Sequence, residues 1–305
     1  MILRRLFVMP LMALASLAVQ AQTITFYTPS TVRVLKEAPN HQKQDGDDLS
    51  LVVRATPQNV KVKVSKSAGV TTYSSAVLTV SVDNASGSVT FKDKKGNVLL
   101  KETAHAFNPI TTGPDKGRYV VSQSWTLDAD EPIYGFGMMQ NGKMNLRGEQ
   151  RLMIQNNQED YAHFFQSLKG YGVYWDNYSP TDICDDLTLK SQVGTKVDYY
   201  FMYGGDADGV IKSMRQLTGK VPMLPLWTYG FHQSRERYKS SKEYTEVLDT
   251  YRKTGVPIDG MIQDWQYWGS NYLWNAMEFL NDDFSDYKQM IKHTHDSNAH
   301  MSISI

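Results

Sequence analysis

The sequence predicts an antiparallel β-sandwich followed by a shorter region of alternating strands and helices with a parallel sheet. Two patterns along the chain lead to this prediction. From Thr23 to about Tyr203, short runs of alternating hydrophobic and polar residues are separated by Asp, Asn, Gly and Pro, as in antiparallel strands joined by turns. After Pro225 the spacing becomes helical, and the helical segments alternate with short apolar runs, which favours parallel strands.

The composition is that of an ordinary globular protein and excludes several classes of function. The 305 residues include 32 basic and 32 acidic side chains, with 41% hydrophobic and 21% charged residues. A net charge of zero, with no predicted basic face, argues against a nucleic-acid partner. The single cysteine, Cys184, cannot form an intrachain disulfide, and no Cys/His cluster has zinc spacing. We therefore expect no metal and no cofactor.

Residues 1–21 have the pattern of a secretory signal peptide. Arg4 and Arg5 precede an apolar run over residues 6–19, and Val19-Gln20-Ala21 places small residues at the positions that a signal peptidase reads. The alternative is an uncleaved anchor, but about 14 apolar residues are short for a span of about 20. The pattern predicts cleavage before Gln22, secretion to the periplasm, and no membrane attachment afterwards.

Residues 22–220 are predicted to form the sandwich domain. Leu78, Val80 and Val82 alternate with polar residues, as in a half-buried strand. Ser88 to Lys92 and Asn97 to Lys101 flank a short turn ending in Gly96, which indicates a hairpin. Further strands are predicted over Thr23 to Tyr27, Leu51 to Ala55, Val60 to Val64, Tyr119 to Trp125, Gly172 to Trp175 and Val197 to Met202.

The junction near residue 220 contains Gly219, Pro222 and Pro225, after which Leu226 to Phe231 is predicted as a buried strand. A helix should follow. Ser240 stands three residues before Glu243, as in a capping box, and Gly255 with Pro257 ends the run. Between them Tyr244, Val247, Leu248 and Tyr251 have helical spacing.

The next elements continue the alternation of strand and helix. Ile258 to Gln263 is predicted as a second strand, and His300 to Ile305 as a third. Between them, Asp282 or Asp283 is expected to cap a helix carrying Phe284, Tyr287 and Ile291 on one side, closed by Asn298. Such a βαβαβ run implies parallel strands. Only 80 residues follow Pro225, whereas a (β/α)₈ barrel takes about 250, so residues 221–305 are expected to be the incomplete front part of a larger domain.

Candidate functional residues follow the first two of these strands. Catalytic and binding groups of parallel α/β folds gather at the carboxyl ends of strands. Asp264, directly after an apolar strand, is interpreted either as a structural carboxylate or as a ligand contact. Trp265 and Trp268 could form a platform for a sugar face or pack the loop onto the fold. Arg235 and Glu236 could contact a ligand or belong to a solvated charge run.

Other chemical signatures are weak or missing from the sequence. His293, His295 and His300 surround Asp296, but two of them lie two apart on one predicted helix and point in different directions, which disfavours metal binding. The sequence has no Gly-rich phosphate loop, Gly-x-Ser-x-Gly or His-Glu-x-x-His motif. Nucleotide-binding, serine-hydrolase and zinc-protease functions are therefore disfavoured.

An ordered set of short motifs resembles glycoside hydrolase family 31. The motifs are Tyr134-Gly135-Phe136-Gly137, Asn145-Leu146-Arg147-Gly148, Gly170 to Ser179, Asp198-Tyr199-Tyr200-Phe201, Leu217-Thr218-Gly219, Met223 to Trp227 and the two strand-end segments. Each is weak alone, but their order over about 135 residues is specific. The resemblance implies an α-glycosidase, with a β-sandwich N-terminal domain followed by the first strands and helices of a (β/α)₈ barrel.

The resemblance also implies a substrate and a site. His232 to Tyr238 followed by Gln263 to Trp268 is most similar to the α-xylosidase branch, which acts on oligosaccharides. In that family the residue matching Asp264 binds hydroxyls of the −1 sugar, and a sandwich loop, here Gln155 to Phe165, reaches toward the pocket. The implied mechanism is retaining, with the nucleophile and the acid/base expected beyond Ile305, so this chain alone would be inactive. An α-glucosidase and a non-catalytic carbohydrate-binding protein remain the alternatives.

Overall fold

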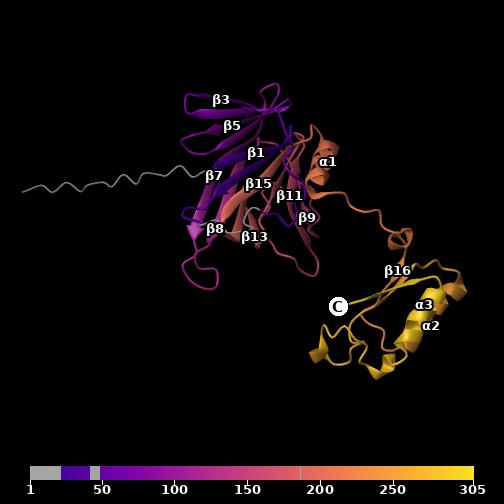
Figure 1. The fold of residues 1–305 in the computed structure, drawn as a ribbon. Coiled ribbons are helices and arrows are strands. Elements are labelled where there is room, and N and C mark those ends of the chain that lie inside the picture. Colours follow the sequence, from indigo (N-terminus) through magenta and orange to yellow (C-terminus); the bar gives the residue numbers. More distant parts are fainter. Residues whose placement is uncertain (1–21, 42–48, 186) are drawn as a thin grey trace, which may run out of the picture. The chain divides into compact units, whose positions relative to one another are not determined.

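The computed structural model describes residues 22–41, 49–185 and 187–305. They form two compact units that divide between Lys220 and Val221, the first indigo to orange and the second orange to yellow in Figure 1. The predicted signal peptide lies outside the described residues. Over the described part of the chain, no helix is long and apolar enough to cross a bilayer.

In its described residues, the first unit contains two antiparallel sheets. The six-stranded sheet has the spatial order β1 (Gln22–Thr28), β2 (Thr31–Glu37), β15 (Lys196–Tyr203), β12 (Tyr171–Trp175), β11 (Asp160–Ser167) and β9 (Ile133–Met138). The nine-stranded sheet has the order β10 (Arg151–Met153), β13 (Thr181–Cys184), β14 (Thr188–Gly194), β8 (Tyr119–Thr126), β7 (Val98–Pro109), β6 (Val89–Asp93), β5 (Leu78–Asp83), β4 (Val70–Ser74) and β3 (Lys63–Ser67). All their pairings are antiparallel.

One hydrophobic core joins the facing sides of these sheets. The Phe91 ring on β6 stacks on Phe201 of β15 at 3.9 Å between centroids, and Trp125 on β8 meets Tyr199 of β15 edge to face at 5.3 Å. Along β8 every second residue from Val121 to Trp125 is buried, which is the period of two that the sequence predicts. The sheets therefore pack face to face, as the predicted sandwich requires.

A buried ion pair interrupts this apolar core. Lys36 Nζ donates to Glu102 Oε2 at 2.7 Å, and both side chains are 2% exposed or less. The carboxylate also accepts hydrogen bonds from the Val89 amide and the Tyr199 hydroxyl, each at 2.7 Å. Lys36 donates a further bond to Gln123 at 3.1 Å. Burial removes both charges from water, which is unfavourable, and the hydrogen bonds within the network offset this desolvation cost.

The outer face of the six-stranded sheet is covered by helix α1 (Ala207–Thr218), an element that the sequence did not predict (Figure 1). Val210 and Leu217 of the helix share a buried cluster with Tyr174, Tyr200 and other residues of the sheet. The predicted strand over residues 51–55 is wrong. In that segment the amides of residues 54 and 55 donate to the Leu217 carbonyl at the end of α1, so these amides do not pair with a strand.

The second unit has a three-stranded parallel sheet with two helices beside each other (Figure 1). Its elements are η1 (Leu226–Tyr229), β16 (His232–Gln233), α2 (Ser241–Thr254), β17 (Gly260–Gln263), η2 (Asn271–Leu273), η3 (Asp282–Phe284), α3 (Tyr287–Asp296) and β18 (His300–Ile303). β17 pairs in parallel with both β16 and β18. The predicted βαβαβ order and parallel pairing are confirmed.

The predicted first strand of this unit is placed wrongly. The apolar run Leu226 to Phe231 forms the 3₁₀ turn η1, and strand β16 begins only at His232. Pro225 provides the reason, because its carbonyl accepts from both the amide and the hydroxyl of Thr228 and so closes a turn. Leu226 and Tyr229 are exposed, so this run is not a buried strand.

The helix signals are partly confirmed. Ser240 caps α2 by accepting from the Glu243 amide at 3.1 Å, and Gly255 ends it with a left-handed φ of 71°. The Glu243 carboxylate accepts from the Lys239 amide instead of completing the predicted capping box. Neither predicted aspartate caps the next helix: Asn281 caps η3, and α3 starts later, at Tyr287.

Candidate functional site

The candidate site lies at the carboxyl ends of the second unit's strands. Gln233 ends β16, and Asp264 follows Gln263, the last residue of β17. Because these strands are parallel and paired in register, their carboxyl ends share one edge of the sheet. The fold thus brings the segments after both strands to the same edge, as the sequence predicts.

Asp264 is half-buried and only lightly engaged. Its Oδ1 accepts from the following amide, that of Trp265, at 2.9 Å, which fixes the side chain against its own turn. Within the described residues no other hydrogen bond or ion pair to this side chain is found. A carboxylate has roughly four acceptor positions, so Asp264 retains acceptor capacity for a hydroxyl-rich ligand.

Gln263 holds the main chain at Asp264, and the sequence did not single it out. The side chain is fully buried, and its Nε2 donates to the carbonyls of Tyr238 at 3.3 Å and Asp264 at 3.2 Å. One amide thereby connects the segment after β16 to the residue after β17. The signal was visible, because a polar residue ended an otherwise apolar run. Its Oε1 has no hydrogen-bond partner in the described part of the chain.

Trp265 forms part of an aromatic stack beside Asp264. Its ring lies nearly parallel to that of Trp274, with 5.9 Å between centroids and 12° between planes. The Arg237 guanidinium lies 5.1 Å from the Trp265 ring centroid and donates a hydrogen bond to Gln266. Gln266 adopts a left-handed φ of 65°, which non-glycine residues rarely do. The loop is therefore held in a specific shape, with Trp274 and Tyr272 exposed.

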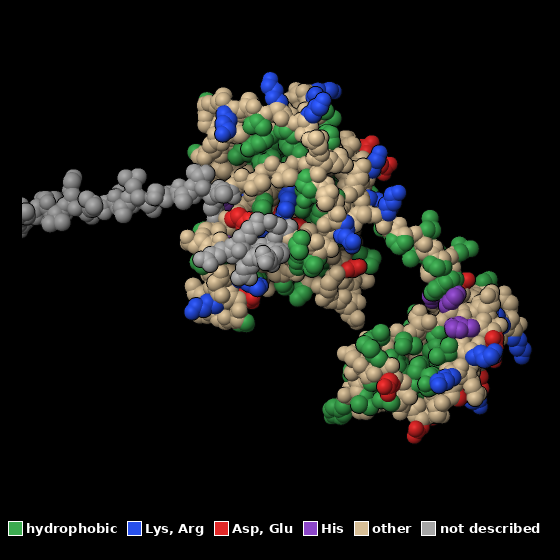
Figure 2. Space-filling model, viewed as in Figure 1, with side chains coloured by type: hydrophobic (Ala, Val, Ile, Leu, Met, Phe, Trp, Pro, Cys, Tyr) green, Lys and Arg blue, Asp and Glu red, His purple; other side chains and the backbone are tan. Residues whose placement is uncertain are grey.

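Trp268 has a different environment from the one a binding platform needs. Its side chain is 0% exposed and packs against Tyr267 at 4.9 Å and Trp274 at 5.0 Å. The structure thus favours the packing alternative for this ring. Its indole N–H has no partner among the described residues. Figure 2 shows that hydrophobic side chains reach the surface of this unit. By their accessibility, Tyr272, Trp274 and Met277 are exposed.

The two charged candidates after β16 are exposed. Arg235 donates to Glu243 on α2 at 2.7 Å, with about half of its side chain in solvent, and stands over the ring of Tyr238. Glu236 is also exposed, and the described residues include no ion pair to it. These positions match the solvated charge run that the sequence analysis left open. Their role as substrate contacts stays a prediction.

The first unit holds the sandwich loop implied by the family resemblance. Gln155 folds this loop back on itself, since its side chain accepts from the Tyr161 amide and donates to Asp160, each at 2.7 Å. Residues from Asp160 onward belong to strand β11.

Over the described residues, no group of three or more His, Cys, Asp or Glu side chains could hold a metal ion.

Both parts of the chain match domains of glycosyl hydrolases. The N-terminal galactose mutarotase-like domain of glycosyl hydrolase family 31 matches residues 21–183, and the TIM-barrel domain of that family matches residues 221–305. The chain therefore belongs to glycoside hydrolase family 31. The predicted fold class, a β-sandwich followed by the start of a (β/α)₈ barrel, is confirmed.

Individual relatives carry several specificities. An α-xylosidase of Saccharolobus solfataricus is 34% identical over 295 residues, which cover 92% of this chain and 39% of that protein. Alpha-glucosidase 2 of Bacillus thermoamyloliquefaciens is 25% identical over 286 residues, or 88% of this chain and 35% of that protein. The crystal structure of an α-xylosidase from Xanthomonas citri superposes with a TM-score of 0.83 at 22% identity, covering 95% of this chain and 48% of that one. The chain thus spans less than half the length of each of these relatives.

Proposed function

We propose that this chain belongs to a retaining α-glycosidase that releases α-linked xylose from oligosaccharides. The observation that carries the proposal is Asp264, a half-buried carboxylate at the carboxyl end of β17 with acceptor capacity to spare. The 34% identity to an α-xylosidase over nearly the whole chain supports xylose as the sugar.

In this proposal Asp264 binds sugar and does not attack it. A carboxylate accepts strong, charge-assisted hydrogen bonds from hydroxyls. Such bonds gain most when the ring distorts toward the oxocarbenium-like state of glycoside cleavage. Trp265 would lie beside the same sugar, and Gln263 would hold the backbone of Asp264 in place through its 3.2 Å bond.

The retaining mechanism needs two more carboxyl groups about 5 to 5.5 Å apart, one as nucleophile and one as acid and base. The family resemblance assigns neither role to a residue of this chain. Kinetics therefore require the protein expressed from its complete reading frame, assayed on p-nitrophenyl α-xyloside and p-nitrophenyl α-glucoside.

Asp264→Asn is the decisive variant. Loss of one transition-state hydrogen bond of this kind costs roughly 2 to 4 kcal/mol, so kcat/KM on the xyloside should fall about 30- to 1000-fold. Asp283→Asn is the matched control, because that carboxylate is exposed in the same unit, and it should leave kcat/KM unchanged. Thermal melts establish that both variants are folded.

Three results would contradict the proposal. Unchanged kcat/KM in folded Asp264→Asn, or a lowered melting temperature with intact activity per folded molecule, would make Asp264 a structural carboxylate. A higher kcat/KM on the glucoside than on the xyloside would identify an α-glucosidase. Binding of both sugars without cleavage would identify a carbohydrate-binding protein.

A further inference from the structure

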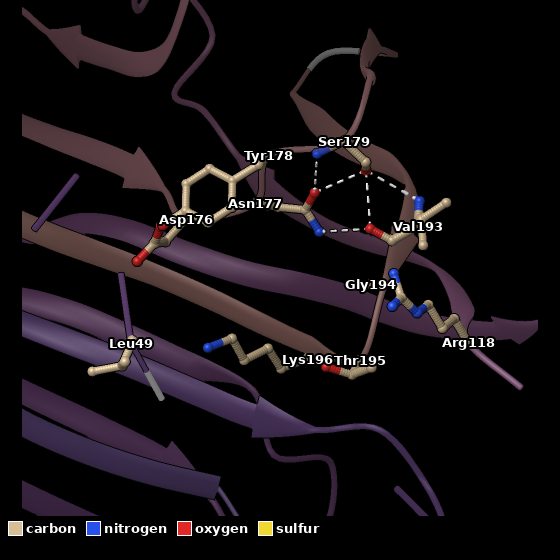
Figure 3. A pocket seen from close by; sticks show the side chains of 10 residues that line it. All are labelled: Leu49, Arg118, Asp176, Asn177, Tyr178, Ser179, Val193, Gly194, Thr195 and Lys196. Atoms are coloured by element: carbon tan, nitrogen blue, oxygen red, sulfur yellow. Dashed lines mark hydrogen bonds between the residues drawn. The ribbon is translucent and has the colours of Figure 1, made fainter. Parts of the chain in front are cut away.

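The first unit has a pocket of its own, shown in Figure 3. Its volume is about 440 Å³, within the range of about 300–1,000 Å³ that is usual for small-molecule sites. The connection from β12 to β13 supplies Asp176, Asn177 and Tyr178 to its wall. Residues at the end of β14 and the start of β15 supply the opposite side, including Lys196, and Arg118 completes it.

The rim of this pocket is fixed by a compact set of hydrogen bonds. Asn177 donates to the Val193 carbonyl at 3.1 Å and accepts from the amide and hydroxyl of Ser179. The Ser179 hydroxyl also accepts from the Val193 amide at 3.1 Å, as the dashed lines of Figure 3 show. The loop after β12 is thereby tied to the end of β14, so the pocket is preorganised.

Asp176 places a nearly buried carboxylate in the wall. The residue is only 6% exposed, and its Oδ1 accepts from the Tyr178 hydroxyl at 2.7 Å and the Tyr174 hydroxyl at 3.5 Å. Both bonds end on the same oxygen, and the Ser50 hydroxyl also bonds the carboxylate. A carboxylate has roughly four acceptor positions, so Asp176 retains acceptor capacity for a ligand hydroxyl. Burial raises the pKa of this carboxyl above its ordinary value.

The other polar groups supply donors and an aromatic face. The ammonium of Lys196 pairs with Asp198 at 3.1 Å, and Arg118 pairs weakly with Asp115 at 3.8 Å while remaining mostly exposed. Tyr178 is 51% exposed, so its ring stands at the pocket surface while its hydroxyl is anchored on Asp176. Arg33 also pairs with both carboxylate oxygens of Asp198. The three cations Lys196, Arg118 and Arg33 are therefore balanced by the three carboxylates Asp176, Asp198 and Asp115, which argues against an anion as the ligand.

We propose that this pocket binds one pyranose unit of a neutral saccharide, separately from the strand-end site. Asp176 would accept from ring hydroxyls, Lys196 and Arg118 would donate to sugar oxygens, and the Tyr178 ring would cover a C–H face. The class of ligand, a saccharide, rests on the proposed function, whereas the pocket and its polar groups belong to the sandwich unit alone.

Calorimetric titration of the 305-residue chain with D-xylose and D-glucose tests this inference. We expect a dissociation constant of about 1 to 10 mM for at least one sugar, the range for a small ligand held by a few hydrogen bonds. Asp176→Asn should weaken that binding at least about tenfold, because it removes the charge from the principal acceptor. Asp130→Asn, an exposed carboxylate of the same unit, is the matched control and should leave binding unchanged.

Arg118→Ala keeps the test decisive if Asp176→Asn does not fold, since its exposed ion pair contributes little to stability. This variant should weaken sugar binding several-fold. The Asp264→Asn variant separates this inference from the proposed function, because it should spare the sandwich site. Binding lost in Asp264→Asn but kept in Asp176→Asn and Arg118→Ala would overturn the inference and leave the strand-end site standing. Binding of phosphate in place of both sugars would also overturn it.

Discussion

Replacing Lys36 by methionine should destabilise the sandwich unit by about 3 to 5 kcal/mol, the usual cost of leaving a buried charge without its partner. Glu102 is 1% exposed and would keep only the Val89 amide and the Tyr199 hydroxyl as donors, each at 2.7 Å. Methionine has no N–H group in its side chain, so it cannot replace the hydrogen bond that Lys36 Nζ donates to Glu102. Burial already lowers the pKa of Lys36, against the raising effect of Glu102, so the pair carries a large desolvation cost.

The assay is urea-dependent hydrogen exchange of strand β6, whose Val89 amide donates directly to Glu102. Exchange at this strand reports the unfolding free energy of the sandwich without a contribution from the second unit. The double variant Lys36→Met/Glu102→Gln removes both charges. Its one carbonyl oxygen at position 102 can still accept from the Val89 amide, and its NH2 group can donate to the Tyr199 hydroxyl oxygen. The double variant should be more stable than the sum of the single changes predicts, by about 0.5 to 3 kcal/mol.

Lys101→Met is the matched control, because Lys101 is exposed on β7 one residue before Glu102. It should change the unfolding free energy by no more than about 0.5 kcal/mol. A similarly small loss in Lys36→Met would refute the reasoning, since it would mean that water reaches Glu102 in the folded protein. Strictly additive single and double variants would show that the two charges do not stabilise one another.

Two further predictions concern acid stability and processing. Burial, with a smaller effect of Lys36, lowers the pKa of His105 from 6.5 to about 4, so the stability contributed by its neutral form is full above pH 6.5 and is lost as the pH falls through about 4. Between pH 7.5 and pH 4.5, urea melts should show a smaller decrease in unfolding free energy for His105→Gln than for the unmodified chain. Equal decreases would exclude this role. Mass spectrometry of secreted protein should find an N-terminus at or near Gln22, and mature protein that retains Met1 would contradict export with cleavage.

Several features of the second unit could be predicted because they are local. Ser240 reaches an amide three residues away, and Gly255 supplies the left-handed conformation that ends the helix. The parallel order of β16, β17 and β18 follows from the alternation of strand and helix. The position of Asp264 at a strand end could be predicted from the apolar run that it follows.

The predictions were wrong in two segments whose composition indicates a strand but whose backbone groups form other hydrogen bonds. The apolar run after Pro225 has the composition of a strand, but the Pro225 carbonyl closes it into a 3₁₀ turn. Residues 51–55 are mostly apolar, as in a strand, yet the amides of residues 54 and 55 donate to the Leu217 carbonyl at the end of helix α1. In both segments, hydrophobicity was read correctly and the hydrogen-bond partner was not.

The sequence by itself determined the fold class, the strand–helix alternation of the second unit and the position of Asp264, because each depends on residues that are close together in the chain. Only the tertiary structure decided that Lys36 meets Glu102, that Trp268 is buried while Trp274 is exposed, and that Asp176 and Lys196 line one pocket. Those outcomes depend on which strands lie side by side. Side chains that are distant in the sequence gain or lose their hydrogen bonds together when the sheets pack, and no local pattern encodes that pairing.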